Sequence, residues 1–193
     1  MGVHESQSRI YENQLGRSRA FCEFLFGHMK QNFSDFGIQT PDAFYKAVNS
    51  VGNGFIRTEA DEVQYNLHVL LRFDLERALV SGDLQVKDLE TAWNDRFYSD
   101  FGYKVNFASQ GCLQDVHWSS GQIGTFCNYT IGNIMAAQLF DTATSENLGI
   151  QTALDGANYA PLRDWLTDSV AQHGRRYTRD ELLVNATGRA LDP

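Results

Sequence analysis

Three polar strings in this sequence hold residue types that could do chemistry. His4 and Glu5 stand side by side near the start of the chain, and both side chains are potential metal ligands. The N-terminus of a helix favours a carboxylate such as Glu5 and lowers its pKa. By spacing alone, a carboxylate that serves a first helical turn beside a solvated histidine explains this pair better than a metal site does. The other two strings are residues 56–61 and the polar and aromatic loop 111–118.

The elements that must position these strings are predicted to be helices joined by ordered loops. Apolar residues recur at helical spacing from Ser6 to about Lys30, and Asn32, Ser34 and Gly37 mark the end of that long helix. Thr40 and Pro41 begin a second helix that runs through Val48. Further helices are predicted over residues 59–80, 86–98, 129–142 and 161–173, with an ordered loop over 102–124 and a capping box over 178–181. The pattern predicts an all-α fold of long helices in one undivided domain, residues 1–193.

Composition excludes several classes of function. The chain has 193 residues, 42% of them hydrophobic, and a formal net charge of -8. Its Lys and Arg residues are scattered, which argues against nucleic acid as a partner. Neither a signal peptide nor a membrane span is visible, so a cytoplasmic protein with no membrane partner is expected. Cys22, Cys112 and Cys127 lack a CxxC spacing and are predicted to be reduced thiols.

The three polar strings, in their order along the chain, resemble the signatures of a known family. They read His4-Glu5-Ser6-Gln7, Ile56-Arg57-Thr58-Glu59-Ala60-Asp61 and Gly111-Cys112-Leu113-Gln114-Asp115-Val116-His117-Trp118. These strings are similar to the HES(Q/G), IRxxAD and GxxQDxHW motifs of the carboxypeptidase Taq family. The resemblance runs almost end to end and also includes residues 61–63, 65–68, 129–133, 173–175 and 186–188.

This resemblance implies a mostly helical, zincin-type enzyme that removes single residues from peptide C-termini. Family members use a divalent metal, usually zinc, bound by the two His of an HExxH motif and by the Glu of HES(Q/G). Glu5 matches that third ligand. No HExxH occurs in this sequence, nor do the family's HPF and DxRxT motifs. We therefore expect zinc or another divalent metal in complete members of the family and no tightly bound metal in this chain alone.

The resemblance also implies roles for residues that would contact a peptide. Arg57 is expected to bind the free carboxylate of a substrate through two parallel charge-assisted hydrogen bonds, and Gln114 is expected to take part in substrate binding. An ion pair of Arg57 with Glu59 or Asp61, or with another partner at a helix end, explains its position equally well. The helix dipole by itself accounts for Asp61 and Glu62.

Two residues are expected to be catalytic by the same resemblance. His117 could hydrogen-bond a substrate carbonyl or carboxylate, or donate to a developing oxyanion, while Gln114 and Asp115 orient it. Packing of His117 beside Trp118 in the loop is the alternative. Tyr129 could donate its phenol to a tetrahedral intermediate, although a Tyr at the start of an apolar helix packs in the core more often than it reacts.

Two hypotheses about function follow. In the first, the chain is the C-terminal part of a metallocarboxypeptidase. It is then inactive alone, is completed by a separately encoded N-terminal half, and forms a homo-oligomer through apolar residues left uncovered. Those residues would include Ile10, Phe21, Phe24, Val63, Leu67 and Leu71. The second hypothesis is a standalone, non-catalytic protein that binds peptide C-termini on the same scaffold. An independent enzyme with a new site would need a constellation of residues that the sequence does not contain.

Overall fold

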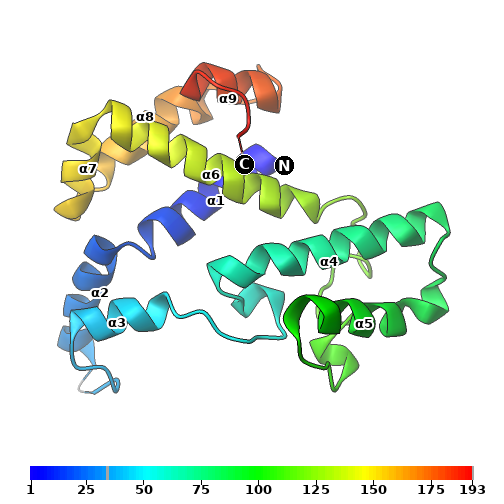
Figure 1. Ribbon diagram of the computed structural model, residues 1–193. Coiled ribbons are helices and arrows are strands. Elements are labelled where there is room, and N and C mark those ends of the chain that lie inside the picture. Colours follow the sequence, from blue (N-terminus) through cyan, green and yellow to red (C-terminus); the bar gives the residue numbers. More distant parts are fainter. Residues whose placement is uncertain (34, 193) are drawn as a thin grey trace. The chain divides into compact units, whose positions relative to one another are not determined.

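The computed structural model describes residues 1–33 and 35–192, and all regular structure within them is helical. Ser34, expected to mark the end of the first helix, lies outside the described residues. The α-helices are α1 (Gly2–Arg9), α2 (Arg19–Asn32), α3 (Pro41–Val48), α4 (Glu62–Ser81), α5 (Leu89–Phe101), α6 (Cys127–Glu146), α7 (Leu148–Asp155), α8 (Ala160–Ser169) and α9 (Arg179–Thr187) (Figure 1). Shorter elements are the π-helix η1 (Ile10–Leu15) and the 3₁₀ turns η2 (Arg57–Glu59), η3 (Val86–Asp88), η4 (Ala108–Gln110) and η5 (Ala171–His173). The predicted all-α fold is confirmed.

The described residues gather into two compact units. One comprises Met1–Asn49 together with the chain from Ile131 onward, and the other comprises Ser50–Thr130. The prediction of one domain over 1–193 stays a prediction.

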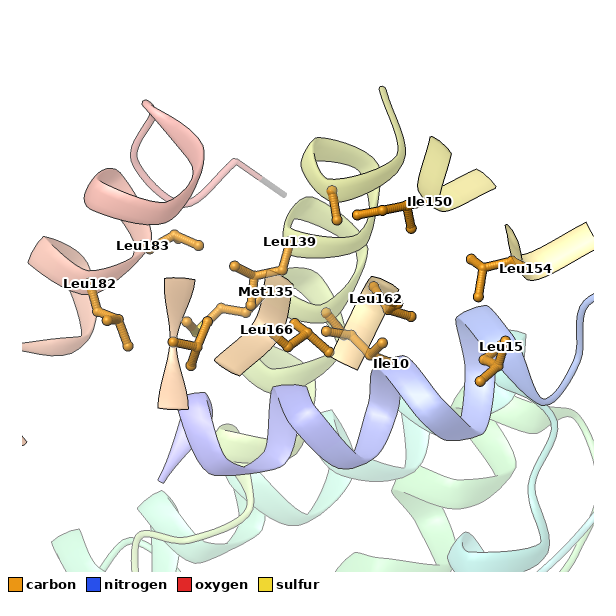
Figure 2. Packing of buried hydrophobic residues seen from close by; sticks show 13 residues of the cluster. Ile10, Leu15, Met135, Leu139, Ile150, Leu154, Leu162, Leu166, Leu182 and Leu183 are labelled. Atoms are coloured by element: carbon orange, nitrogen blue, oxygen red, sulfur yellow. The ribbon is translucent and has the colours of Figure 1, made fainter. Parts of the chain in front are cut away.

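The first unit has its main core between α6, α8 and the N-terminal segment. Figure 2 shows Met135 and Leu139 of α6 gathered with Leu162 and Leu166 of α8 and with Ile10 of η1. All five side chains are buried. A smaller cluster joins α2 to α3 through Cys22, Phe26 and Phe44. Burial of these apolar side chains is the main stabilising term for the unit.

The second unit is built around α4 and α5, which lie alongside each other in Figure 1. Leu71 and Leu75 of α4 pack against Trp93 and Phe97 of α5. A second cluster of Tyr65, Val69 and Phe126 lies under the loop that precedes α6. The loop is therefore fixed on α4, as the prediction of an ordered loop over 102–124 requires.

Helix capping explains where several helices begin. Thr40 accepts a hydrogen bond from the Ala43 amide at 3.1 Å, with Pro41 at the first helical position. Thr178 and Glu181 form the predicted capping box of α9. Both predicted helix starts are confirmed, because a cap satisfies amides that the first turn leaves without partners.

The predicted long helix over residues 6–30 is wrong as one element. The structure divides it into α1, η1 and α2, with a break at Gly16–Ser18. Ser18 has extended backbone dihedrals, and its side chain accepts a hydrogen bond from the Phe21 amide at 3.2 Å. It therefore begins a new helix. Helix α7 was not predicted, although Asn147 caps it by accepting from the Gly149 amide at 3.1 Å.

Within the described part of the chain, no helix is both long and apolar enough to cross a membrane.

Candidate functional site

Arg57 is the first residue of turn η2, which precedes α4. Its Nε and Nη2 atoms donate to Asp115 Oδ1 at 3.0 and 2.7 Å, and its Nη1 donates to the Tyr65 hydroxyl at 2.9 Å. The partner of its ion pair is thus Asp115, from the loop, in place of Glu59 or Asp61. Asp61 caps α4 instead, by accepting from the Gln64 amide at 2.8 Å. Arg57 is buried, so its charge depends on these partners.

Asp115 is shared by two buried guanidinium groups. Its Oδ2 accepts from Arg72 Nε at 2.5 Å, and the Arg72 side chain is fully buried. Burial by itself raises the pKa of Asp115, but Arg72 and Arg57 outweigh burial and hold that pKa below its usual range. Burial lowers the pKa of Arg72 to about 10, which still leaves it charged at neutral pH.

The charges of this trio do not cancel. Two guanidinium groups and one carboxylate sum to +1 + 1 − 1, a net charge of +1 at neutral pH. An excess positive charge of this kind attracts an anionic group, and a guanidinium suits a carboxylate best. The cluster of Arg57, Arg72 and Asp115 is hereafter called the arginine cluster.

His117 lies against the arginine cluster and contacts Tyr129. Its Nε2 is 2.8 Å from the Tyr129 hydroxyl, within hydrogen-bond distance. Its Nδ1 is 3.7 Å from Asp115 Oδ1, too long for a direct hydrogen bond. Burial lowers the pKa of His117, and Arg57 acts in the same direction. The imidazole is therefore neutral at neutral pH and can exchange a proton with the phenol.

Tyr129 comes from the first turn of α6, and its ring faces Arg57. The guanidinium carbon of Arg57 lies 4.9 Å from the Tyr129 ring centroid. The structure thus brings together Arg57, His117 and Tyr129, three of the residues expected from the sequence, in the second unit. Their roles stay predictions.

The Gln114 side chain forms hydrogen bonds with backbone atoms. Its Oε1 accepts from the Arg57 amide at 2.8 Å, and its Nε2 donates to the carbonyl oxygens of Phe55 and Gln110 at 2.9 and 2.8 Å. These bonds tie the turn that carries Arg57 to the loop that carries Asp115.

Arg72, Tyr65 and Glu76 are neighbours of the site that were not predicted from the sequence. Arg72 and Glu76 lie one turn apart in α4, and both are buried. A charged residue among the apolar residues of a core helix is a signal that could have found them, because such a side chain needs a buried partner.

Glu5 lies in the first unit, in the first turn of α1. Its Oε1 accepts from Arg9 Nε at 2.9 Å, and its side chain is about one fifth exposed. In the described residues, no group of three or more His, Cys, Asp or Glu side chains could hold a metal ion. The role of Glu5 as a metal ligand stays a prediction.

The side chain of Glu5 packs on the backbone of α6 at Gly132. A Cβ atom at Gly132 would lie 2.6 Å from Glu5 Cγ and 2.7 Å from Glu5 Cβ. We expect Gly132→Ala to lower the free energy of unfolding by about 1–3 kcal/mol, because α1 and α6 must separate. Gly27→Ala in α2 is the matched control, since open space surrounds Gly27, and it should stabilise the chain by up to about 1 kcal/mol. Equal effects in urea denaturation would contradict the close contact.

Comparison with known proteins places these residues in a family context. The model of the family described as carboxypeptidase Taq (M32) metallopeptidase matches residues 1–193. Thermostable carboxypeptidase 1 of Pyrococcus furiosus is 41% identical over 192 residues, which are 100% of this chain and 38% of that protein. Thermostable carboxypeptidase 1 of Thermus thermophilus is 40% identical over 98% of this chain and 37% of its own length.

A solved structure shows the same relationship. The crystal structure of the M32 carboxypeptidase from Deinococcus radiodurans R1 superposes with a TM-score of 0.92 and 44% identity. The match covers 99% of this chain and 39% of that one. The chain therefore spans less than two fifths of the length of the relatives that it matches.

Proposed function

The chain belongs to the carboxypeptidase Taq (M32) metallopeptidase family, and we propose that it forms the C-terminal part of a metallocarboxypeptidase that releases single residues from peptide C-termini. The observation that carries this proposal is the family match over residues 1–193, joined to relatives named as carboxypeptidases. The match to this chain covers 38% of the length of the Pyrococcus furiosus relative.

The arginine cluster supports a role in binding the free carboxylate at a peptide end. Arg57 has five N–H donors, and the described hydrogen bonds use three of them, on Asp115 and Tyr65. The net positive charge of the cluster favours an anionic group beside it. We expect Gln114 to take part in binding by holding the backbone of Arg57 in place.

His117 and Tyr129 are proposed as the catalytic pair. His117 Nε2 lies 2.8 Å from the Tyr129 hydroxyl, and in the tautomer that carries the proton on Nε2 the imidazole donates to the phenol oxygen and leaves the phenol O–H free to donate elsewhere. A phenol in that position can donate a hydrogen bond to the oxyanion that forms when a peptide carbonyl is attacked.

A divalent metal belongs to the chemistry of the family, and the donor set in this chain does not fit one by itself. Glu5 is the ligand that the family resemblance assigns, and the described residues add no group of three potential ligands around a common point. We derive no catalytic step through the metal, and we propose that zinc binds only when further ligands are supplied.

We expect the purified chain to release no amino acid from a short N-blocked peptide in the presence of zinc. A catalytic zinc site needs two further protein ligands and a general base. In the family the HExxH motif supplies all three, and this sequence contains no HExxH. Adding the separately produced part of the Pyrococcus furiosus carboxypeptidase that this chain does not cover should restore release that a chelator abolishes. The measurement is free amino acid by chromatography.

Matched variants make this assay decisive. In the mixture, Glu5→Ala should abolish release, and Glu23→Gln, at an exposed position of α2, should not change it. Turnover by the chain alone that is lost with chelator and with Glu5→Ala would refute the expected inactivity. A mixture that stays inactive but binds peptides with a free C-terminal carboxylate more tightly than their amides would favour the non-catalytic alternative.

We also propose that the chain self-associates through α4. Val63, Leu67 and Leu70 recur at helical spacing along α4 and are exposed by 65%, 37% and 44%. Two residues of the predicted apolar surface, Ile10 and Leu71, are instead fully buried. Covering roughly 300 Å² of apolar surface gains several kcal/mol at about 25 cal/mol per Å².

Light scattering at micromolar concentration tests this association. We expect a mass above the 21.8 kDa of one chain, reduced by Leu70→Glu and unchanged by Val184→Glu at an exposed position of α9. A symmetric dimer is the commonest arrangement. A single species of 21.8 kDa would contradict the proposal.

A further inference from the structure

One buried carboxylate on α4 is bonded to two points of the loop that carries His117. Glu76 Oε2 accepts from the Trp118 indole nitrogen at 2.7 Å, and Glu76 Oε1 accepts from the Gly124 amide at 2.6 Å. Glu76 is only 5% exposed. Each oxygen therefore has its own donor, which is the arrangement that a buried carboxylate needs.

Aromatic packing continues from these bonds to the imidazole. Trp118 packs edge-on against Phe126, with ring centroids 5.9 Å apart, and Phe126 packs against His117 at 4.4 Å. Trp118 also meets Trp93 of α5 at 6.2 Å, with an interplanar angle of 88°. A shift of the Trp118 ring would therefore be transmitted to the wall against which His117 lies.

We propose that Glu76 is a positioning residue, which keeps His117 buried beside Asp115 and Tyr129 by holding Trp118 and Gly124. Loss of either bond leaves the loop free to move away from α4. His117 then becomes hydrated, and its contact with the Tyr129 phenol is weakened. This inference rests on the proposed function only for what the site binds, because its test reads His117 directly and needs no turnover.

The sign of the change in the His117 pKa separates positioning from simple electrostatics. Burial is the main cause that lowers this pKa, Arg57 and Arg72 also lower it, and Asp115 and Glu76 raise it. Tyr129 is also titratable and contacts the ring. Removing the charge of Glu76 from an unmoved loop would lower the pKa of His117. Loosening the loop relieves burial and raises it.

The experiment is an NMR titration of the histidine rings in the whole chain. His117→Asn identifies the His117 signal. We expect Glu76→Gln to raise the His117 pKa by about half a unit or more, because an amide offers one acceptor in place of two. Trp118→Phe removes one donor and keeps the carboxylate, so it should raise the pKa as well. It also serves as the test if Glu76→Gln does not fold.

The double variant and two controls complete the test. In Glu76→Gln with Trp118→Phe, the amide oxygen can turn to Gly124, so the rise should be smaller than the sum of the single effects. Glu62→Gln, in the exposed first turn of α4, and Leu166→Ala, which destabilises the chain through the core of the first unit, should not change the native His117 pKa. A fall or no change in Glu76→Gln and Trp118→Phe would overturn the proposal, as would an equal rise in Leu166→Ala.

Discussion

Asp115→Asn is expected to lower the free energy of unfolding by about 3–5 kcal/mol at pH 7, because it leaves two buried guanidinium groups without a counter-ion. Arg57 and Arg72 both bond to this carboxylate, and Arg72 is completely buried. Asparagine keeps the shape of the side chain but offers one acceptor oxygen and no charge. Urea denaturation followed by circular dichroism measures the loss.

The control for Asp115→Asn is Asp164→Asn, which removes a carboxylate from an exposed pair. Asp164 bonds to Arg163, and both side chains are about three fifths exposed. Exposed pairs of this kind add little to stability, so no measurable loss is expected. Similar losses for the two variants would show that the arginine cluster is not a buried charge network.

In acid, the free energies of unfolding of the parent chain and of Asp115→Asn should become more alike. The folded pKa of Asp115 lies below its unfolded value, so its contribution is complete above the unfolded pKa of about 3.9 and is lost as the pH falls through the folded pKa. The difference in free energy of unfolding between the two chains should therefore be constant from pH 7 to about pH 5 and narrow below about pH 4. A difference that stays constant in acid would contradict the shared counter-ion.

Local signals made most of the helices predictable from the sequence. Thr40 with Pro41, and Thr178 with Glu181, satisfy the first amides of a helix through their own side chains, so neighbouring residues are enough to place α3 and α9. The break at Gly16–Ser18 carries the same kind of signal, a serine cap, but the apolar spacing continues across it. The continuous apolar spacing therefore predicted one helix, although Ser18 caps a new one.

The site was predictable only where motifs marked it. Arg57, His117 and Tyr129 were found through their family strings, and the structure places them together. Arg72 belongs to no such string, and its partner Asp115 lies 43 residues away in sequence. A buried ion pair across that separation depends on how α4 meets the loop, which no local pattern encodes.

His68 is a fully buried imidazole in α4. It lies against Phe101, with ring centroids 4.6 Å apart, and its Nε2 is 3.2 Å from the Gly54 carbonyl oxygen. Burial lowers the pKa of His68 to about 4, and the charge of Arg72 acts in the same direction. Protonation in the folded state would place a positive charge among aromatic rings and beside two guanidinium groups.

The sign of the linkage is set by this depressed pKa. Between about pH 6.5 and about pH 4 the unfolded chain binds a proton at His68 and the folded chain does not, so stability is full at neutral pH and falls as the pH falls. A difference of about 2.5 pKa units corresponds to roughly 3 kcal/mol. We expect this loss between pH 7 and pH 4, in addition to a smaller one of the same sign from His117.

His68→Phe should remove most of the fall in the free energy of unfolding between pH 7 and pH 4. Phenylalanine does not titrate, and its ring suits the aromatic surroundings. The Gly54 carbonyl oxygen keeps a hydrogen-bond donor, because the Tyr103 hydroxyl donates to it at 2.8 Å. The larger ring will cost some stability at every pH, so the readout is the slope of the free energy of unfolding against pH, measured in urea from pH 7 to pH 4.

His28→Gln, which removes an imidazole from an exposed position of α2, is the control and should keep the slope of the parent chain. If His68→Phe retains that slope, His68 is not the group that carries the sensitivity to acid. If it flattens the slope while His28→Gln does not, the buried imidazole of α4 is the main source of the instability of this chain below neutral pH.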